Sequence, residues 1–186
     1  MEIANYLYLR FRAMVPGALL ALLLFAAFLP ARRRRLARLG LVSSRRRETV
    51  LALFWTWCGA MAMMLFFPPD FDVLNVLRFG YEGPFFRPGA TNLRLMQTLH
   101  YGLGVFIANV MMFIPFGFCP ALLWRRSRWW NALLIAAAIP VVVENWQIHI
   151  GRSFDVDDLL LNTVGAMLGW AIWHLCKRPT LFCEEK

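Results

Sequence analysis

The strongest constraint on this chain is a series of apolar stretches, each about as long as a membrane is thick. A hydrocarbon core of about 30 Å requires roughly 20 apolar residues per spanning helix. Hydrophobic residues make up 60% of the 186 residues, and the mean hydropathy of +0.53 is too high for a soluble domain of this size. We therefore predict a single all-α membrane domain over residues 1–186, a polytopic bundle of about five transmembrane helices. The predicted spans are 13–29, 49–67, 102–124, 129–150 and 159–176.

Arginines predict how this bundle is oriented. Eight of them lie between residues 32 and 47, and three more lie at 125–128. Because cytoplasmic connectors carry an excess of Lys and Arg, we expect both segments inside, with the N-terminus outside and the C-terminus inside. The loops at 68–101 and 151–158 then face out. Basic runs flanked by apolar spans favour contact with anionic membrane lipids over nucleic acid, and we expect no nucleic-acid partner.

Two other interpretations of the sequence receive less support. A cleaved signal peptide is disfavoured because the arginines follow the first apolar stretch, where they oppose translocation. The four cysteines at 58, 119, 176 and 183 lie within spans or at the cytoplasmic end, in no metal-binding spacing. We expect neither a disulfide nor a metal, and no cofactor.

The outer loop at 68–101 is unusually aromatic, with phenylalanines and a tyrosine among prolines and glycines. A fully solvated loop has little use for such side chains. Two interpretations stay open, a lid folded back onto the membrane surface and simple loop packing. Residues 92–101 carry a pattern that fits a short interfacial helix.

Polar residues within the spans are the best candidates for function. Glu144 lies about six residues from the outer end of its span, which places it about 9 Å below that boundary. An ionised carboxylate at this depth must be paired, protonated or in contact with a wet cavity. Gln147 shares its helix face, and Asn109 enters the outer half of the membrane from the third span.

The last span begins with acids and continues as one polar and small face. Asp158, Asn162, Gly165 and Gly169 follow at i, i+4, i+7 and i+11. The two glycines allow another helix to approach this face closely, so we expect its polar residues to point inward. With Asp155 at the helix start, three helices are then predicted to bring polar groups to one neighbourhood.

Structural roles remain open for several of these residues. Asp155 at the start of a helix is typical of an N-cap. Asn109 and Asn162 are also suited to join helices by hydrogen bonds, which contribute about 0.6 kcal/mol each on average. Arg152 has a neighbouring acid with which to form an ion pair.

Three segments resemble motifs of the VanZ-like family of bacterial membrane proteins. They are the stretch 109–117, the stretch from Glu144 and Gln147 through 152–165, and the short motif 75–79 that contains Asn75. The resemblance covers about residues 75–170. The family is named for an accessory protein of glycopeptide resistance that raises tolerance to teicoplanin. The resemblance therefore implies the outer face of the bacterial cytoplasmic membrane, and a setting of cell-wall precursors or lipids.

Two functions of different classes follow from the residues and this resemblance. The first is an envelope factor whose outer-leaflet pocket recognises an amphiphile, such as a lipoglycopeptide antibiotic, a phospholipid or a lipid-linked wall precursor. Asn109, Gln147, Arg152, Asn162 and Asn75 are its candidate binding residues.

The second is an intramembrane enzyme acting on a lipid-linked envelope substrate. Glu144 and Asp158 form its candidate acid–base pair, with Asp155 as an alternative. The sequence has no nucleophile beside a base at a known spacing, no phosphate loop and no metal set. A proton-coupled carrier that uses Glu144 ranks third, because polar residues in one leaflet give no path across the membrane.

Overall fold

The computed structural model describes residues 2–95, 102–124, 129–176, 181 and 184–185, and these are mostly helical. The helical class predicted from the sequence is confirmed. The helices are α1 (Glu2–Arg38), α2 (Arg45–Phe66), α3 (Val73–Phe79), α4 (Leu103–Leu123), α5 (Trp129–Gln147) and α6 (Val156–Leu175). Four two-residue strands accompany them, β1 (Leu41–Val42), β2 (Thr91–Asn92), β3 (Phe154–Asp155) and β4 (Glu184–Glu185).

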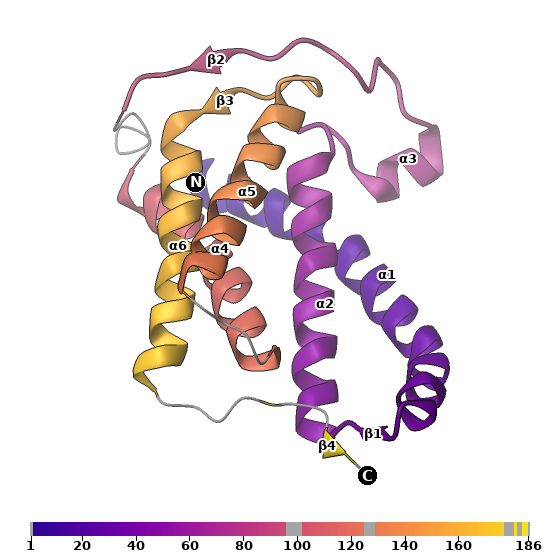
Figure 1. Ribbon diagram of the computed structural model, residues 1–186. Coiled ribbons are helices and arrows are strands. Elements are labelled where there is room, and N and C mark those ends of the chain that lie inside the picture. The colour runs from indigo at the N-terminus through magenta and orange to yellow at the C-terminus, as the bar shows by residue number, and fades with distance from the viewer. Residues whose placement is uncertain (1, 96–101, 125–128, 177–180, 182–183, 186) are drawn as a thin grey trace.

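Among the described residues, three helices are long and apolar enough to cross a membrane. They are Arg12–Arg38 of α1, all of α2 and all of α4. The fourth and fifth predicted spans correspond to α5 and α6, which pack in the same bundle (Figure 1). The five-span count and the orientation stay predictions.

The first helix is longer than predicted. The sequence suggested an end near Pro30 and placed the following arginines in a connector, but α1 contains both Pro16 and Pro30 and continues to Arg38. An interior proline removes a backbone donor and its ring clashes with the carbonyl four residues earlier, which can kink a helix without ending it. Arginine is a good helix former, and cations are stabilised near a helix C-terminus, so the helix continues through the basic run.

The helices alternate in direction between two ends of the bundle (Figure 1). We call the end that carries residues 67–95 and the α5–α6 connection the loop end. The opposite end, with the α1–α2 connection and the C-terminus, is the arginine end. Helix α1 packs along α2, whereas α6 packs along both α4 and α5. The buried core between these groups includes Met61, Phe113 and Val143.

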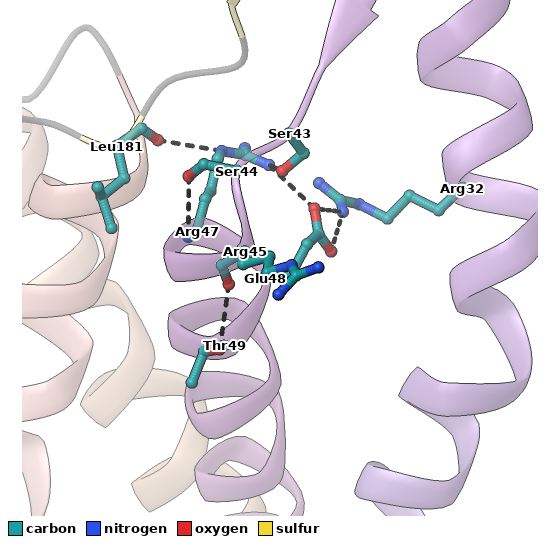
Figure 2. A network of polar contacts seen from close by, with 8 residues as sticks. All are labelled: Arg32, Ser43, Ser44, Arg45, Arg47, Glu48, Thr49 and Leu181. Carbon is teal, nitrogen blue, oxygen red and sulfur yellow. Dashed lines mark hydrogen bonds and ion pairs between the residues drawn. The ribbon is translucent and has the colours of Figure 1, made fainter.

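At the arginine end, a buried acid holds the α1–α2 connection together (Figure 2). Glu48 is 8% exposed and accepts hydrogen bonds of 2.5 Å from Arg32 of α1. Ser44 caps α2 by accepting from the backbone of Arg47, whose side chain donates to the carbonyl of Leu181 at 3.0 Å. Strand β1 also pairs antiparallel with β4, so the C-terminal segment is tied to this connection.

At the loop end, Arg12 of α1 forms an ion pair of 3.1 Å with Asp72. Asp72 is also the N-cap of α3. A basic residue just before the first predicted span thus has an acidic partner in the loop at 68–101. Helix α3 itself was not anticipated. In the segment for which a short interfacial helix was considered, Thr91–Asn92 form β2, and residues 96–101 lie outside the described part.

Candidate functional site

Glu144 lies in the last two turns of α5 and is almost fully enclosed. It is 1% exposed, and its Oε2 accepts a hydrogen bond of 2.9 Å from the backbone N–H of Asp155. The charges of Asp155, Asp158 and Arg152 all act on it. The structure therefore brings the predicted acids and the predicted arginine into one cluster at the loop end.

Asp155 joins three parts of this cluster. Its backbone binds Glu144 of α5, while its Oδ1 accepts from the N–H of Asp157 at 2.9 Å and caps α6. Its Oδ2 accepts from Asn92 Nδ2 at 3.0 Å. The capping role considered for Asp155 is thus present, and the same carboxylate also connects the outer loop to the bundle.

Asp158 and the face below it pack against α4. Asn109 of α4 donates a hydrogen bond to Asp158. A Cβ at Gly165 would collide with the carbonyl oxygen of Val110, and one at Gly169 with that of Ile114. The close helix approach predicted from the glycine spacing is therefore present, and the partner is α4, which runs parallel to α6.

Asn162 lies one turn below Asp158 on α6. It is 4% exposed, and its Oδ1 has no hydrogen-bond partner among the described residues. A buried amide oxygen without a donor is costly. Asn162 lies on the predicted face of α6. Its Oδ1, however, does not form the hydrogen bond to another helix that was considered for this residue.

Gln147 and Arg152 are engaged with the end of α2. Gln147 Nε2 donates to the carbonyl of Leu65 at 3.4 Å, and Arg152 donates to that of Met64 at 2.6 Å. Trp146 Nε1 donates to the carbonyl of Phe66 at 2.9 Å. The last carbonyls of a helix lack intrahelical partners, so these side chains complete the C-terminus of α2.

Asn75 stands apart from this cluster. It is exposed on α3, where its backbone N–H donates to the Asp72 carboxylate at 3.3 Å. In Figure 1, α3 lies beyond α2 as seen from α6. The structure therefore does not bring Asn75 together with the other candidates.

Several aromatic rings of the loop at 68–101 contact one another and the C-cap residue of α2 that precedes the loop. The rings of Phe67 and Phe71 contact each other at a tilt, with centroids 4.7 Å apart, and Phe85 packs edge-on against both of them. Phe86 then contacts Trp146 of α5, with centroids 6.0 Å apart. These contacts leave Phe67, Phe71 and Phe85 half-buried and Phe86 64% exposed, and they attach the loop to the end of α5 at the loop end of the bundle.

Residues 85–92, which we call the strap, are bound to the α5–α6 connection by their backbone. Arg87 exchanges two hydrogen bonds of 2.9 Å with this connection, one to the carbonyl of His149 and one from the N–H of Gly151. Strand β2 pairs parallel with β3. A Cβ at Gly89 would collide with the carbonyl oxygen of Arg152, so glycine permits this close contact.

An ion pair outside the membrane spans adds to this attachment. Asp70 accepts a hydrogen bond from Arg87, and Tyr81 also contacts it at 3.5 Å. Desolvation opposes ionisation of Asp70, but the hydrogen bond and charge of Arg87 outweigh it and lower the pKa of this carboxyl. The charged form of Asp70 thus helps to hold the strap.

Two cavities open where α5 reaches the loop end of the bundle. The upper groove, of about 710 Å³, lies between the strap residues 86–89 and 91 and the helix end at Trp146, 148 and His149. The lower cavity, of about 330 Å³, is lined by Phe66, residues 141–142 and 145, and again by Trp146 and His149. Glu144 and Gln147, which are 1% and 4% exposed, line neither cavity.

The donor set gives no support for a metal centre in the described ranges. No group of three or more His, Cys, Asp or Glu side chains there is arranged to hold a metal ion. Arg152 and the backbone N–H of Asp155 instead supply the donors and charge that the carboxylate of Glu144 requires.

A family model described as VanZ/LLP1 matches residues 18–177. The chain belongs to the VanZ/LLP1 family. The VanZ/LLP1 match extends the resemblance seen in the motifs toward both ends, from the first long helix to the end of α6. No curated protein and no solved structure matches the chain.

Sequence reasoning missed several residues that shape this end of the VanZ/LLP1 domain. Trp146 contacts both cavities and caps α2, and Asn92 binds Asp155. Arg87 fixes the strap. The unusual aromatic content of the outer loop was the signal for such packing, but the sequence did not indicate which helix end the loop covers.

Proposed function

We propose that this protein is a multi-pass protein of the bacterial cytoplasmic membrane that recognises an amphiphile at its outer surface and so contributes to glycopeptide tolerance. Membership in the VanZ/LLP1 family suggests a role in glycopeptide resistance at the envelope. The amphiphile is a lipoglycopeptide antibiotic such as teicoplanin, a phospholipid or a lipid-linked wall precursor.

The observation that carries the proposal is the upper groove at the loop end. Its volume of about 710 Å³ lies within the range of small-molecule sites, which combine an apolar wall with a few polar groups. Phe86 and Trp146 supply that wall, and Arg87, Thr91 and His149 supply the polar groups. The residues of the buried cluster around Glu144 do not line the groove.

An intramembrane enzyme remains the second candidate because Glu144 and Asp158 share one buried cluster and interact through their charges. An acid–base pair requires such proximity and two different environments. In this function the strap opens to admit a lipid-linked substrate to Glu144.

One experiment separates the two functions. Purified full-length protein in detergent is incubated with radiolabelled lipid-linked wall precursor, and both bound label and released products are measured. Recognition predicts saturable binding with unchanged label. Product formation that is abolished by Glu144→Gln establishes the enzyme instead, and absence of both binding and product refutes the two functions for this ligand.

A cellular measurement tests the glycopeptide role. Expression in a susceptible bacterium is expected to raise the inhibitory concentration of teicoplanin. Glu144→Gln is expected to lose this effect at normal abundance, because the amide keeps an oxygen for Asp155 N–H but removes the charge balanced by Arg152. Full tolerance of the Gln variant would show that the charge of Glu144 is not required for the function.

A further inference from the structure

The upper groove and the lower cavity have two side chains in common. Trp146 and His149 contribute to both, so the two spaces adjoin at the outer end of α5. Residues 141, 142, 145 and 146 recur at the spacing of a single face of α5, and His149 follows in the turn after the helix. The lower cavity therefore continues the groove along α5 toward the membrane interior.

The walls of the two spaces differ in polarity. The lower cavity is bounded by Val141 and Val142, which are 49% and 60% exposed. On a predicted membrane span, such exposed apolar side chains face lipid. The upper groove has Arg87, Thr91 and His149 at its lining. A groove that carries a charged side chain thus adjoins a more apolar cavity that lies further along α5.

The charged residue that lines the upper groove indicates which head group a bound lipid would carry. Arg87 is the charged side chain of the upper groove, and no carboxylate lines either space. A guanidinium carries five N–H donors and binds phosphate well. One amino group of Arg87 donates to Asp70, and the remaining donors are those through which a phosphate would be recognised.

We propose that the two spaces form one seat for a single outer-leaflet lipid with a phosphate in its head group, the phosphate at Arg87 and His149 and an acyl chain along Val141 and Val142. This inference deepens the proposed function and rests on it for the location of the site. It assigns recognition to Trp146, His149 and Arg87 rather than to the buried cluster around Glu144.

Lipid retention tests the seat directly. Full-length protein is reconstituted with equal amounts of phosphatidylglycerol and a diglucosyl diacylglycerol with the same acyl chains, then progressively delipidated and weighed by native mass spectrometry. One phosphatidylglycerol is expected to persist, favoured about tenfold over the glycolipid, which is the ratio given by one charge-assisted hydrogen bond. Retention without preference for the phosphate lipid would overturn the proposal.

Matched variants separate the seat from general lipid contact. Val142→Trp fills the lower cavity and is expected to lose the retained lipid. Leu134→Trp introduces the same side chain at a position of α5 that is 66% exposed and lines neither space, and is expected to keep the lipid. Equal retention in both variants would refute the acyl part of the seat.

Head-group recognition needs its own control, because Arg87 also holds the strap. Arg87→Gln is expected to abolish the preference for phosphatidylglycerol, whereas Asp70→Asn breaks the same ion pair but leaves the arginine and is expected to preserve it. Loss of preference in both would assign the effect to the strap and refute recognition by Arg87. A lipid retained by a protein that gives no teicoplanin tolerance would refute the proposed function and leave the seat intact.

Discussion

Replacement of Asp155 by alanine tests how the loop end is held together. The side chain makes two contacts, one that caps α6 through Asp157 N–H and one with Asn92 of the strap. Its backbone bond to Glu144 does not depend on the side chain. The variant therefore removes a cap and a strap attachment while leaving the Glu144 contact in place.

The expected cost follows from these two contacts. Loss of an Asp N-cap costs about 1 kcal/mol, and loss of one side-chain hydrogen bond costs about 1 kcal/mol. Asp155→Ala is thus expected to lower the free energy of unfolding by about 2 kcal/mol. Asp155→Asn keeps the cap, because Asn serves as well as Asp in that position, but its single amide oxygen cannot also accept from Asn92. This variant is therefore expected to lose only the strap contact, at a cost of about 1 kcal/mol.

The assay is reversible unfolding of the purified chain in mixed micelles, followed by helical circular dichroism. A double-mutant cycle with Asn92→Ala isolates the strap contact, for which we expect a coupling free energy of about 1 kcal/mol. Single-variant effects that add within about 0.3 kcal/mol would show that Asn92 and Asp155 do not interact. That result would refute the attachment of the strap through Asp155.

Three further predictions concern packing, topology and pH. Gly165→Leu is expected to destabilise the bundle by about 1–3 kcal/mol in the same assay, because the new side chain meets α4 backbone; wild-type stability would refute the close approach. A cysteine at Ser153 is expected to react with an impermeant thiol reagent added outside cells, and one at Ser43 is not, whereas the opposite pattern would invert the topology. The pKa of Asp70 is lowered in the folded protein, so its pairing with Arg87 stabilises the fold above about pH 4 and this contribution is lost as pH falls further. The melting temperatures of wild type and Asp70→Asn are expected to converge at low pH, and a constant difference would contradict the pairing.

Features governed by a single helix were predictable from the sequence. The face formed by Asp158, Gly165 and Gly169 follows from helical spacing alone, and the structure packs it against α4. The burial expected for Glu144 likewise follows from a charged residue in an apolar helix.

Features that depend on backbone groups of another element were not predictable. Arg152 and Gln147 bind carbonyls at the end of α2, and a carbonyl carries no sequence signature. Strands β2 and β3 have two residues each, too few for an alternating pattern. The position of the strap therefore follows only from the three-dimensional structure, in which residues 85–92 lie against the α5–α6 connection.

The capping of α2 by side chains from α5 and from the connection after it has a consequence for biogenesis. The chain emerges from the ribosome with α1 and α2 first, and these pack on each other. The carbonyls of Met64, Leu65 and Phe66 lack these hydrogen-bond donors until residues about 80 positions later have been synthesised. A ribosome-bound or truncated chain that ends before Trp146 would expose an incomplete helix end at the membrane surface, a feature by which quality-control proteases can distinguish unfinished from finished protein.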